Sequence, residues 1–232
     1  MNQDIIDWLY GLSAPMVVLH KDKGASYTSP FFYPQQDFVD MSESWGIDSR
    51  ETLLNCVFDM VDDGHASTLS QYYFIYSRYA EFDWCNYYNE QTDYQKVLLD
   101  FVKQTFPICG VASIRSWDYA RMAYILRNGI TNKYITEQEA LWILFRIGIR
   151  AQYYYSSWQH YFTSWFIGYQ YWISLNNKEN LELLRCELSR ASNAHTMTNL
   201  YSDLQAPFNR LPWFIDLDDQ QKPESLMEYQ WS

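Results

Sequence analysis

The 232-residue sequence has few basic side chains, glycines, prolines or cysteines. It contains 17 Lys and Arg against 28 Asp and Glu, for a formal net charge of −11, and only eight Gly, seven Pro and four Cys. Because nucleic-acid affinity depends on basic side chains that displace counterions from phosphates, we expect no nucleic-acid partner. The small number of chain breakers and the absence of an internal repeat predict one compact domain.

The motifs of several common enzyme classes are also absent. The sequence has no H-E-x-x-H, no G-x-S-x-G and no G-x-x-x-x-G-K-[ST], which disfavours zinc peptidases, serine hydrolases and P-loop enzymes. Its histidines are isolated, and Cys56, Cys85, Cys109 and Cys186 form no C-x-x-C pair. We therefore expect no metal, no cofactor, and reduced, buried thiols of the kind found in cytoplasmic proteins.

The sequence lacks a long apolar run as well. The most apolar stretch, residues 140–149, is about half the length of a membrane span and is interrupted by Arg146. The N-terminal residues 1–16 have no basic region of the kind that begins a secretory signal. These features predict a cytoplasmic protein that does not bind membranes.

Aromatic residues are abundant, with 21 Tyr, 13 Phe and 10 Trp. Combined with helical periodicity, they predict a mainly α fold: a single compact multi-helix domain with an aromatic-rich core. We expect residues 1–47 to form a loop-rich N-terminal extension that packs on the domain and has room for a short hairpin. Residues 48–215 form the helical domain in this prediction, and residues 216–232 form an acidic C-terminal tail.

Capping signals and apolar spacing divide the chain into expected helices. The first starts at the pair Asp48 and Glu51 and stops at Gly64, and two more cover about 68–79 and 94–102. Ser113 or Ser116 is expected to cap the next helix, which ends at Asn128-Gly129.

Three further helices are expected in the second half of the chain. One starts at the capping box Thr136-x-x-Glu139, and a charged one covers 178–190. Between them, Trp158, Trp165 and Trp172 are spaced by seven residues, which predicts one buried stripe along a long helix.

Six short motifs occur in one order between residues 45 and 215, and together they carry a family resemblance. They are Trp117-Asp118-x-x-Arg121, Leu126-Arg127-x-Gly129, Tyr134-Ile135-Thr136-x-x-Glu139-Ala140, Tyr155-Ser156-Ser157-Trp158, Gly168-x-x-x-Trp172 and Leu211-Pro212-Trp213. With these motifs the chain resembles the bacterial domain-of-unknown-function family 1266, the YbeU/YbeR-like proteins. The resemblance implies a mostly helical bacterial domain and brings no reaction with it. Family members often have Arg after the central Gly, where this chain has Tyr169, so a site that depends on that guanidinium would be altered here.

Asp118 and Arg121 have two interpretations. As neighbours at i and i+3 near a helix start, they are first expected to be a structural clamp that fixes helix packing. Alternatively, they belong to a pocket in which Asp118 orients a ligand or accepts a proton and Arg121 holds an anionic group. Trp117, Tyr155 and Trp158 would then lie around the same pocket.

The distribution of charge leads to a first hypothesis about function. Residues 1–110 carry six basic and 16 acidic side chains, and Asp59, Asp62 and Asp63 form a candidate acidic docking surface. We therefore expect a non-catalytic protein-interaction factor, immunity-like or regulatory, whose basic protein partner could be a toxin domain. The alternative is an enzyme or small-ligand binder with a pocket around Asp118 and Arg121.

A second acidic group, Asp216, Asp218 and Asp219, lacks the spacing of a calcium-binding loop and is expected to be a solvated edge.

Overall fold

The computed structural model describes residues 2–176, 198–204, 206–217 and 220–229. In these ranges the chain forms α-helices and short 3-10 turns but no β-strand, so the expected mainly α fold is confirmed. The hairpin allowed for in residues 1–47 is reduced to one antiparallel bridge between Met41 and Ile47. The α-helices are α1 (Gln3–Gly11), α2 (Ala14–Leu19), α3 (Ser42–Trp45), α4 (Arg50–Asp63), α5 (His65–Arg78), α6 (Glu81–Asn89), α7 (Asp93–Cys109), α8 (Arg115–Thr131), α9 (Glu137–Tyr154) and α10 (Trp158–Asn176), and residues 198–202 are also helical.

Helix α8 is the central element, because 14 of its 17 residues are buried. Helices α4, α9 and α10 pack around it. Two glycines permit this packing: a Cβ on Gly129 would collide with Leu53 of α4, and one on Gly168 of α10 would collide with the Cβ of Trp117. Helix α8 continues through Asn128-Gly129 to Thr131, so the predicted stop is wrong. The glycine there makes room for α4 and does not end the helix.

The helix starts depend on both local and distant partners. The capping box Thr136–Glu139 at α9 is confirmed, with Thr136 N donating to Glu139 Oε2 at 2.7 Å. Helix α4 uses the box Ser49–Thr52, one residue after the predicted pair. At α8 the residue before the helix is Ile114, which provides no side-chain cap, so the prediction of a serine cap is wrong.

The region from α5 to α7 differs most from expectation. The predicted range 68–79 matches α5 except for Tyr79, which follows the helix, and 94–102 falls in α7. Both helices are longer than predicted, and α6 is not predicted by the sequence. Helix α6 has no side-chain cap, and Trp84 is its one buried residue, so the sequence carries little sign of it. The helix expected over 178–190 lies outside the described residues.

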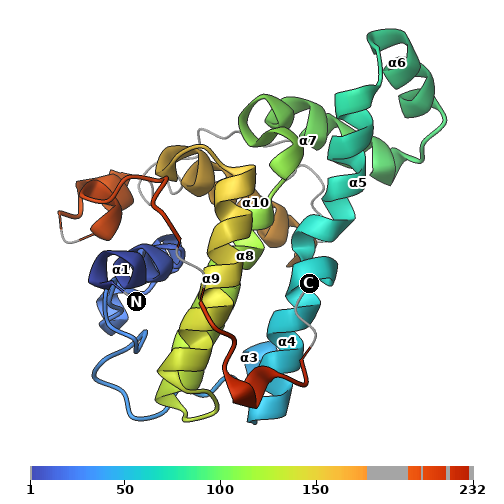
Figure 1. Cartoon of the computed structure of the whole chain (residues 1–232). Helices are drawn as coiled ribbons and strands as arrows, with labels where there is room; N and C mark the ends of the chain where they lie inside the picture. Colours follow the sequence, from blue (N-terminus) through green and yellow to red (C-terminus); the bar gives the residue numbers. More distant parts are fainter. Residues whose placement is uncertain (1, 177–197, 205, 218–219, 230–232) are drawn as a thin grey trace.

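Two hydrophobic clusters divide the molecule. The larger cluster joins α1, α2, α4, α8, α9, α10 and the C-terminal segment, and we call these elements the body. The smaller cluster joins α5, α6 and α7, and it also includes Ile167 and Tyr171 of α10. Trp158 and Trp165 are buried in the body as expected, whereas Trp172 is 36% exposed and reaches the surface. Figure 1 shows α6 at the far end of α5, away from α1, α8 and α9.

A fully buried cation, Arg127 of α8, organises the N-terminal loop. It donates to the hydroxyl of Ser13 at 2.7 Å and to the carbonyl oxygens of Ser26 and Ser29. Its guanidinium lies 5.1 Å from the ring centres of both Tyr10 and Phe32. Burial lowers the pKa of Arg127 to about 9, so the side chain stays charged at neutral pH while it holds the loop by its carbonyl groups.

Three cysteines lie in the part of the chain that the structure describes, and all three are free thiols. Cys109 is buried, Cys56 is half-buried and Cys85 is exposed, so the expectation of buried thiols is wrong for Cys85. Cys186 lies outside the described residues. Among the described helices, no single one has the length and apolar character needed to cross a membrane.

Candidate functional site

Asp118 lies at the junction between α4 and α5. Its Oδ2 accepts a hydrogen bond from the backbone N–H of Ala66 at 2.8 Å, and its Oδ1 accepts one from His65 at 3.2 Å. The residue before α5 is Gly64, which has no side chain to cap the helix. A Cβ at Gly64 would come within 2.5 Å of Asp118 Oδ2. Asp118 thus caps α5 from a neighbouring helix, and its charge favours the positive end of the α5 dipole.

Arg121 lies one turn further along α8. Its Nη1 is 3.3 Å from Asp118 Oδ1 and 2.7 Å from His65 Nδ1. Since a guanidinium can only donate, His65 Nδ1 is the acceptor. The guanidinium carbon lies 4.8 Å from the ring centre of Trp45 and 5.4 Å from that of Trp117. Burial lowers the pKa of Arg121, and the charge of Asp118 opposes that shift. These contacts favour the clamp interpretation for Asp118.

A pocket of about 290 Å³ opens beside Arg121, and Asp118 is not part of its wall. Its walls come from α2, α3, α8 and α10: the aromatic side chains are Trp45, Trp117, Tyr169 and Trp172, and the polar ones are His20, Ser44 and Arg121. Asp118 instead borders a separate crevice of about 40 Å³, close to the space that one water needs. The cation and the carboxylate that were expected to share a site therefore face different spaces.

Tyr155 and Trp158, the other two residues proposed for this site, lie in the core of the body. The Tyr155 hydroxyl accepts a hydrogen bond from the backbone N–H of Ser116 at 2.8 Å, and burial raises the pKa of Tyr155. Trp158 donates to the carbonyl oxygen of Leu211 at 3.0 Å and packs on Trp213, with ring centres 4.8 Å apart. Their polar atoms are engaged in holding segments together.

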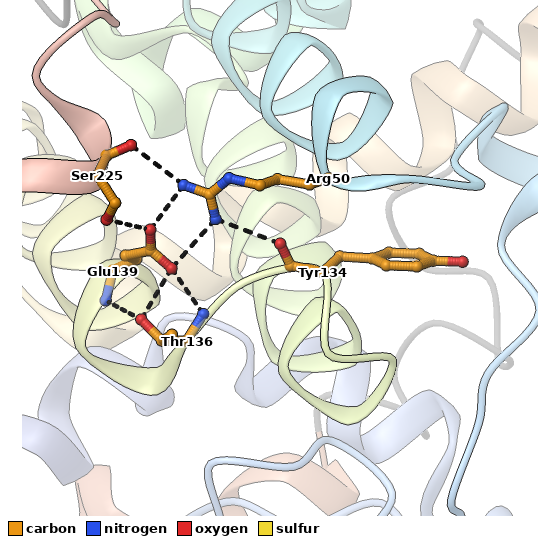
Figure 2. Close-up of polar contacts among 5 residues, drawn as sticks. All are labelled: Arg50, Tyr134, Thr136, Glu139 and Ser225. Atoms are coloured by element: carbon orange, nitrogen blue, oxygen red, sulfur yellow. Dashed lines mark hydrogen bonds and ion pairs between the residues drawn. The ribbon is translucent and has the colours of Figure 1, made fainter.

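A second polar cluster surrounds Glu139 (Figure 2), and the sequence predicts only its Thr136 part. Arg50 of α4 donates to Glu139 Oε1 at 2.6 Å and to the carbonyl oxygen of Tyr134 at 3.3 Å. Ser225 donates to Oε1 and Thr136 to Oε2. Burial acts to raise the pKa of Glu139, but the hydrogen bonds from Arg50, Ser225 and Thr136 outweigh it and hold that pKa at about 2. The Glu139 carboxylate therefore holds α4, α9 and the C-terminal segment together, which is a structural role.

Exposed aromatic side chains gather at the end of α5, on α6 and at the start of α7, a surface that we call the α6 arm (residues 74–94). Phe82 is 75% exposed and Phe74 58%, and Tyr79 and Tyr94 are exposed too. The acidic side chains Glu81, Asp83, Glu90 and Asp93 are exposed between them, and the arm's one basic residue is Arg78. The acidic surface predicted from the sequence is a different one, formed by Asp59, Asp62 and Asp63. The sequence does not predict the arm, because α6 has no side-chain cap that would indicate a helix there.

The predicted acidic docking residues Asp59, Asp62 and Asp63 are exposed on the last turns of α4. Carboxylates at a helix C-terminus oppose the helix dipole, so they do not stabilise α4. They lie at the opposite end of α5 from α6. Asp218 and Asp219, from the second acidic group, lie outside the described residues.

Comparisons with known proteins identify relatives over most of the chain. A family model described as "Protein of unknown function (DUF1266)" matches residues 40–213. The uncharacterized protein YbeR of Escherichia coli (strain K12) is 40% identical over 182 residues, which are 78% of this chain and 77% of YbeR. The uncharacterized protein YbeU of the same organism is 34% identical over 217 residues, which are 92% of each chain. No solved structure matches significantly.

Proposed function

Since the chain belongs to the DUF1266 family, whose description assigns no activity, we propose a function from its own geometry: a non-catalytic protein-interaction factor that binds a basic protein partner. The α6 arm is the observation that carries this proposal. It presents Phe74 of α5 and Phe82 of α6 to solvent, and α6 lies at the far end of α5, away from the body (Figure 1). Aromatic side chains are enriched in the centres of protein interfaces, and exposed apolar patches mark interaction surfaces.

The charge of the arm favours a basic partner. Glu81, Asp83, Glu90 and Asp93 against Arg78 give residues 74–94 a formal charge of −3. Acidic side chains on the same segment as exposed aromatic rings attract a positively charged surface, accelerate the encounter and repel acidic competitors.

The buried carboxylates support a non-catalytic role. Asp118 accepts two backbone hydrogen bonds at the start of α5, and Glu139 binds Arg50, Ser225 and Thr136. A general base must be able to reach a proton of the substrate. Both carboxylates are occupied by structural donors, so neither is placed for that reaction.

An immunity-like or regulatory protein fits this proposal, with a basic toxin domain as one partner of suitable charge. We place the encounter in the cytoplasm, where the free thiols of Cys56, Cys85 and Cys109 would persist.

An amphipathic peptide of Lys and Leu serves as the probe for this surface, with binding followed by fluorescence anisotropy. Phe82→Ser should weaken binding by about tenfold, which corresponds to about 1.4 kcal/mol. Tyr153→Ser is the matched control, because Tyr153 is 82% exposed on α9 in the body. Equal effects of the two changes would contradict docking on the arm.

A second comparison separates the arm from the acidic surface expected from the sequence. One double variant, Glu81→Gln with Asp83→Asn, removes two charges from the arm, and another, Asp59→Asn with Asp62→Asn, removes two from α4. The first should weaken peptide binding and its dependence on salt more than the second. The reverse order would move the docking surface to the end of α4, and equal losses would show attraction to net charge alone.

A further inference from the structure

The pocket beside Arg121 is not used by the proposed protein interaction. It measures about 290 Å³ and lies between α3, α8 and α10, whereas the α6 arm is built from α5, α6 and α7. Ligand pockets in proteins start at about 300 Å³, so this space suits a compound of one or two rings. A peptide or a dinucleotide would not fit.

Arg121 gives this pocket a guanidinium with hydrogen-bond donors that the fold leaves unused. Its side chain is 13% exposed, and Nη1 makes the contacts with His65 and Asp118. Among the residues that the structure describes, Nη2 and Nε have no hydrogen-bond partner. A guanidinium presents its N–H groups in a rigid fork that matches a carboxylate, so a planar acid can accept from both nitrogens at once.

The walls of the pocket favour a flat ring. Tyr169 and Trp172 lie 5.9 Å apart with ring planes only 20° from parallel, and Trp117 lies 5.7 Å from Tyr169. The Nε1 of Trp117 is buried and has no hydrogen-bond partner within the described part of the chain, so Trp117 lines the pocket with its ring. Large aromatic surfaces with a few polar groups are typical of small-molecule sites.

The charge of the lining selects an anion. The pocket is lined by Arg121 and by no Asp or Glu. Burial lowers the pKa of His20, so this imidazole is neutral at pH 7 and its Nδ1 bonds the Tyr33 hydroxyl at 2.7 Å. Asp118 pairs with Nη1 of Arg121 and accepts the two backbone N–H groups at the start of α5, but it is not part of the pocket wall. A cationic ligand would therefore meet Arg121 without a compensating carboxylate in the wall.

We propose that this pocket binds a small planar aromatic carboxylate, whose carboxyl group accepts hydrogen bonds from Nη2 and Nε of Arg121 while its ring packs on the Trp and Tyr side chains. The site is separate from the α6 arm, so either proposal can fail without the other.

Isothermal titration calorimetry of the full chain with naphthalene-2-carboxylate tests the site. The matched probes are naphthalene-2-carboxamide, which keeps the ring without the charge, and cyclohexanecarboxylate, which keeps the charge without the aromatic ring. We expect one saturable site for naphthalene-2-carboxylate and binding about tenfold to a hundredfold weaker for the carboxamide, since a charge-assisted pair is lost. Equal affinity for acid and amide, or no binding of any probe, would overturn the proposal.

Variants then locate the binding. Arg121→Gln should weaken carboxylate binding to the level of the carboxamide, whereas Arg115→Gln should leave it unchanged. Arg115 is a matched control because it also lies on α8 and stacks on a ring, that of Tyr154 at 4.6 Å, outside the pocket. Because Arg121 also supports the α5 junction, Ser44→Trp is needed as a second variant: Ser44 is exposed and lines the pocket, so an indole there blocks it without removing a buried contact. Unchanged binding by Ser44→Trp would place the ligand elsewhere and overturn the assignment.

Discussion

In the body, Trp165 and Tyr161 are fully buried, whereas Phe82 and Phe74 on the α6 arm are largely exposed. The charged side chains of the two regions differ in the same way: those named below are buried in the body and exposed on the arm. Asp118, Arg127 and Glu139 each join segments that are far apart in the sequence. The acidic side chains of the arm lie at its surface. Aromatic and acidic side chains thus stabilise the body, where neighbours surround them, whereas on the arm Phe74, Phe82 and the acidic side chains are exposed to solvent.

The strongest test of this contrast removes the buried cation Arg127. In Arg127→Met the acceptors at Ser13, Ser26 and Ser29 lose their donor inside the body. We expect the free energy of unfolding in urea to fall by about 3 to 5 kcal/mol. Arg115→Met, at the more accessible start of the same helix, should cost less than about 1 kcal/mol. Similar losses for both would mean that the N-terminal loop does not depend on Arg127.

The next effect concerns the junction between the two regions. Asp118→Ala removes the cap of α5 and leaves Arg121 without its carboxylate, so we expect a loss of about 2 to 3 kcal/mol. Thermal unfolding followed by circular dichroism measures it, with Asp63→Ala as the exposed control. An Asp118→Ala protein of normal stability would refute the clamp and revive a chemical role for Asp118.

Acid should weaken the body through Glu139. The pKa of Glu139 is about 2 in the folded chain against 4.5 for a free side chain, so the folded state binds this proton less readily. Its contribution is complete above pH 4.5 and is lost as the pH falls toward 2. We expect a loss of about 2 kcal/mol, reduced from the full shift because Arg50 is partly exposed. Urea unfolding at about pH 5 and about pH 3 should show a smaller difference for Glu139→Gln than for the unmodified chain; equal differences would contradict this role.

The smallest effect is expected on the arm itself. Phe82→Ser should change the free energy of unfolding by no more than about 0.5 kcal/mol, because the ring is already exposed. Trp84→Ala, two residues along the same helix, removes a buried ring and should cost about 3 kcal/mol. A large loss in Phe82→Ser would mean that Phe82 belongs to the core and that the arm is not a free surface.

The sequence predicted local features well. The box Thr136–Glu139 and the stripe of Trp158, Trp165 and Trp172 depend on spacing along one helix; the box is present, and the stripe is buried at Trp158 and Trp165 but not at Trp172. The bond from Arg50 to Glu139 joins residues 89 positions apart, and no spacing rule could anticipate it. Gly129 shows the same limit, because its sequence context suggests a helix end and the neighbouring Leu53 explains why it lies inside α8.

The candidate site was predicted in part for the same reason. Asp118 and Arg121 were recognised as a pair on one helix turn, and they do lie 3.3 Å apart. Trp45 and Trp172 were not connected with them, since they come from α3 and α10. Tyr155 and Trp158 were placed beside the pair, but their side chains point into the core of the body.

The order of residues determined by itself that this chain would form amphipathic, aromatic-rich helices, since periodicity and capping act within a few residues. Packing alone decided which rings would be covered, which carboxylates would be occupied, and where Arg121 would keep free donors. Those outcomes depend on contacts between helices distant in sequence, and the energy of a buried charge or ring is set by the neighbours that surround it.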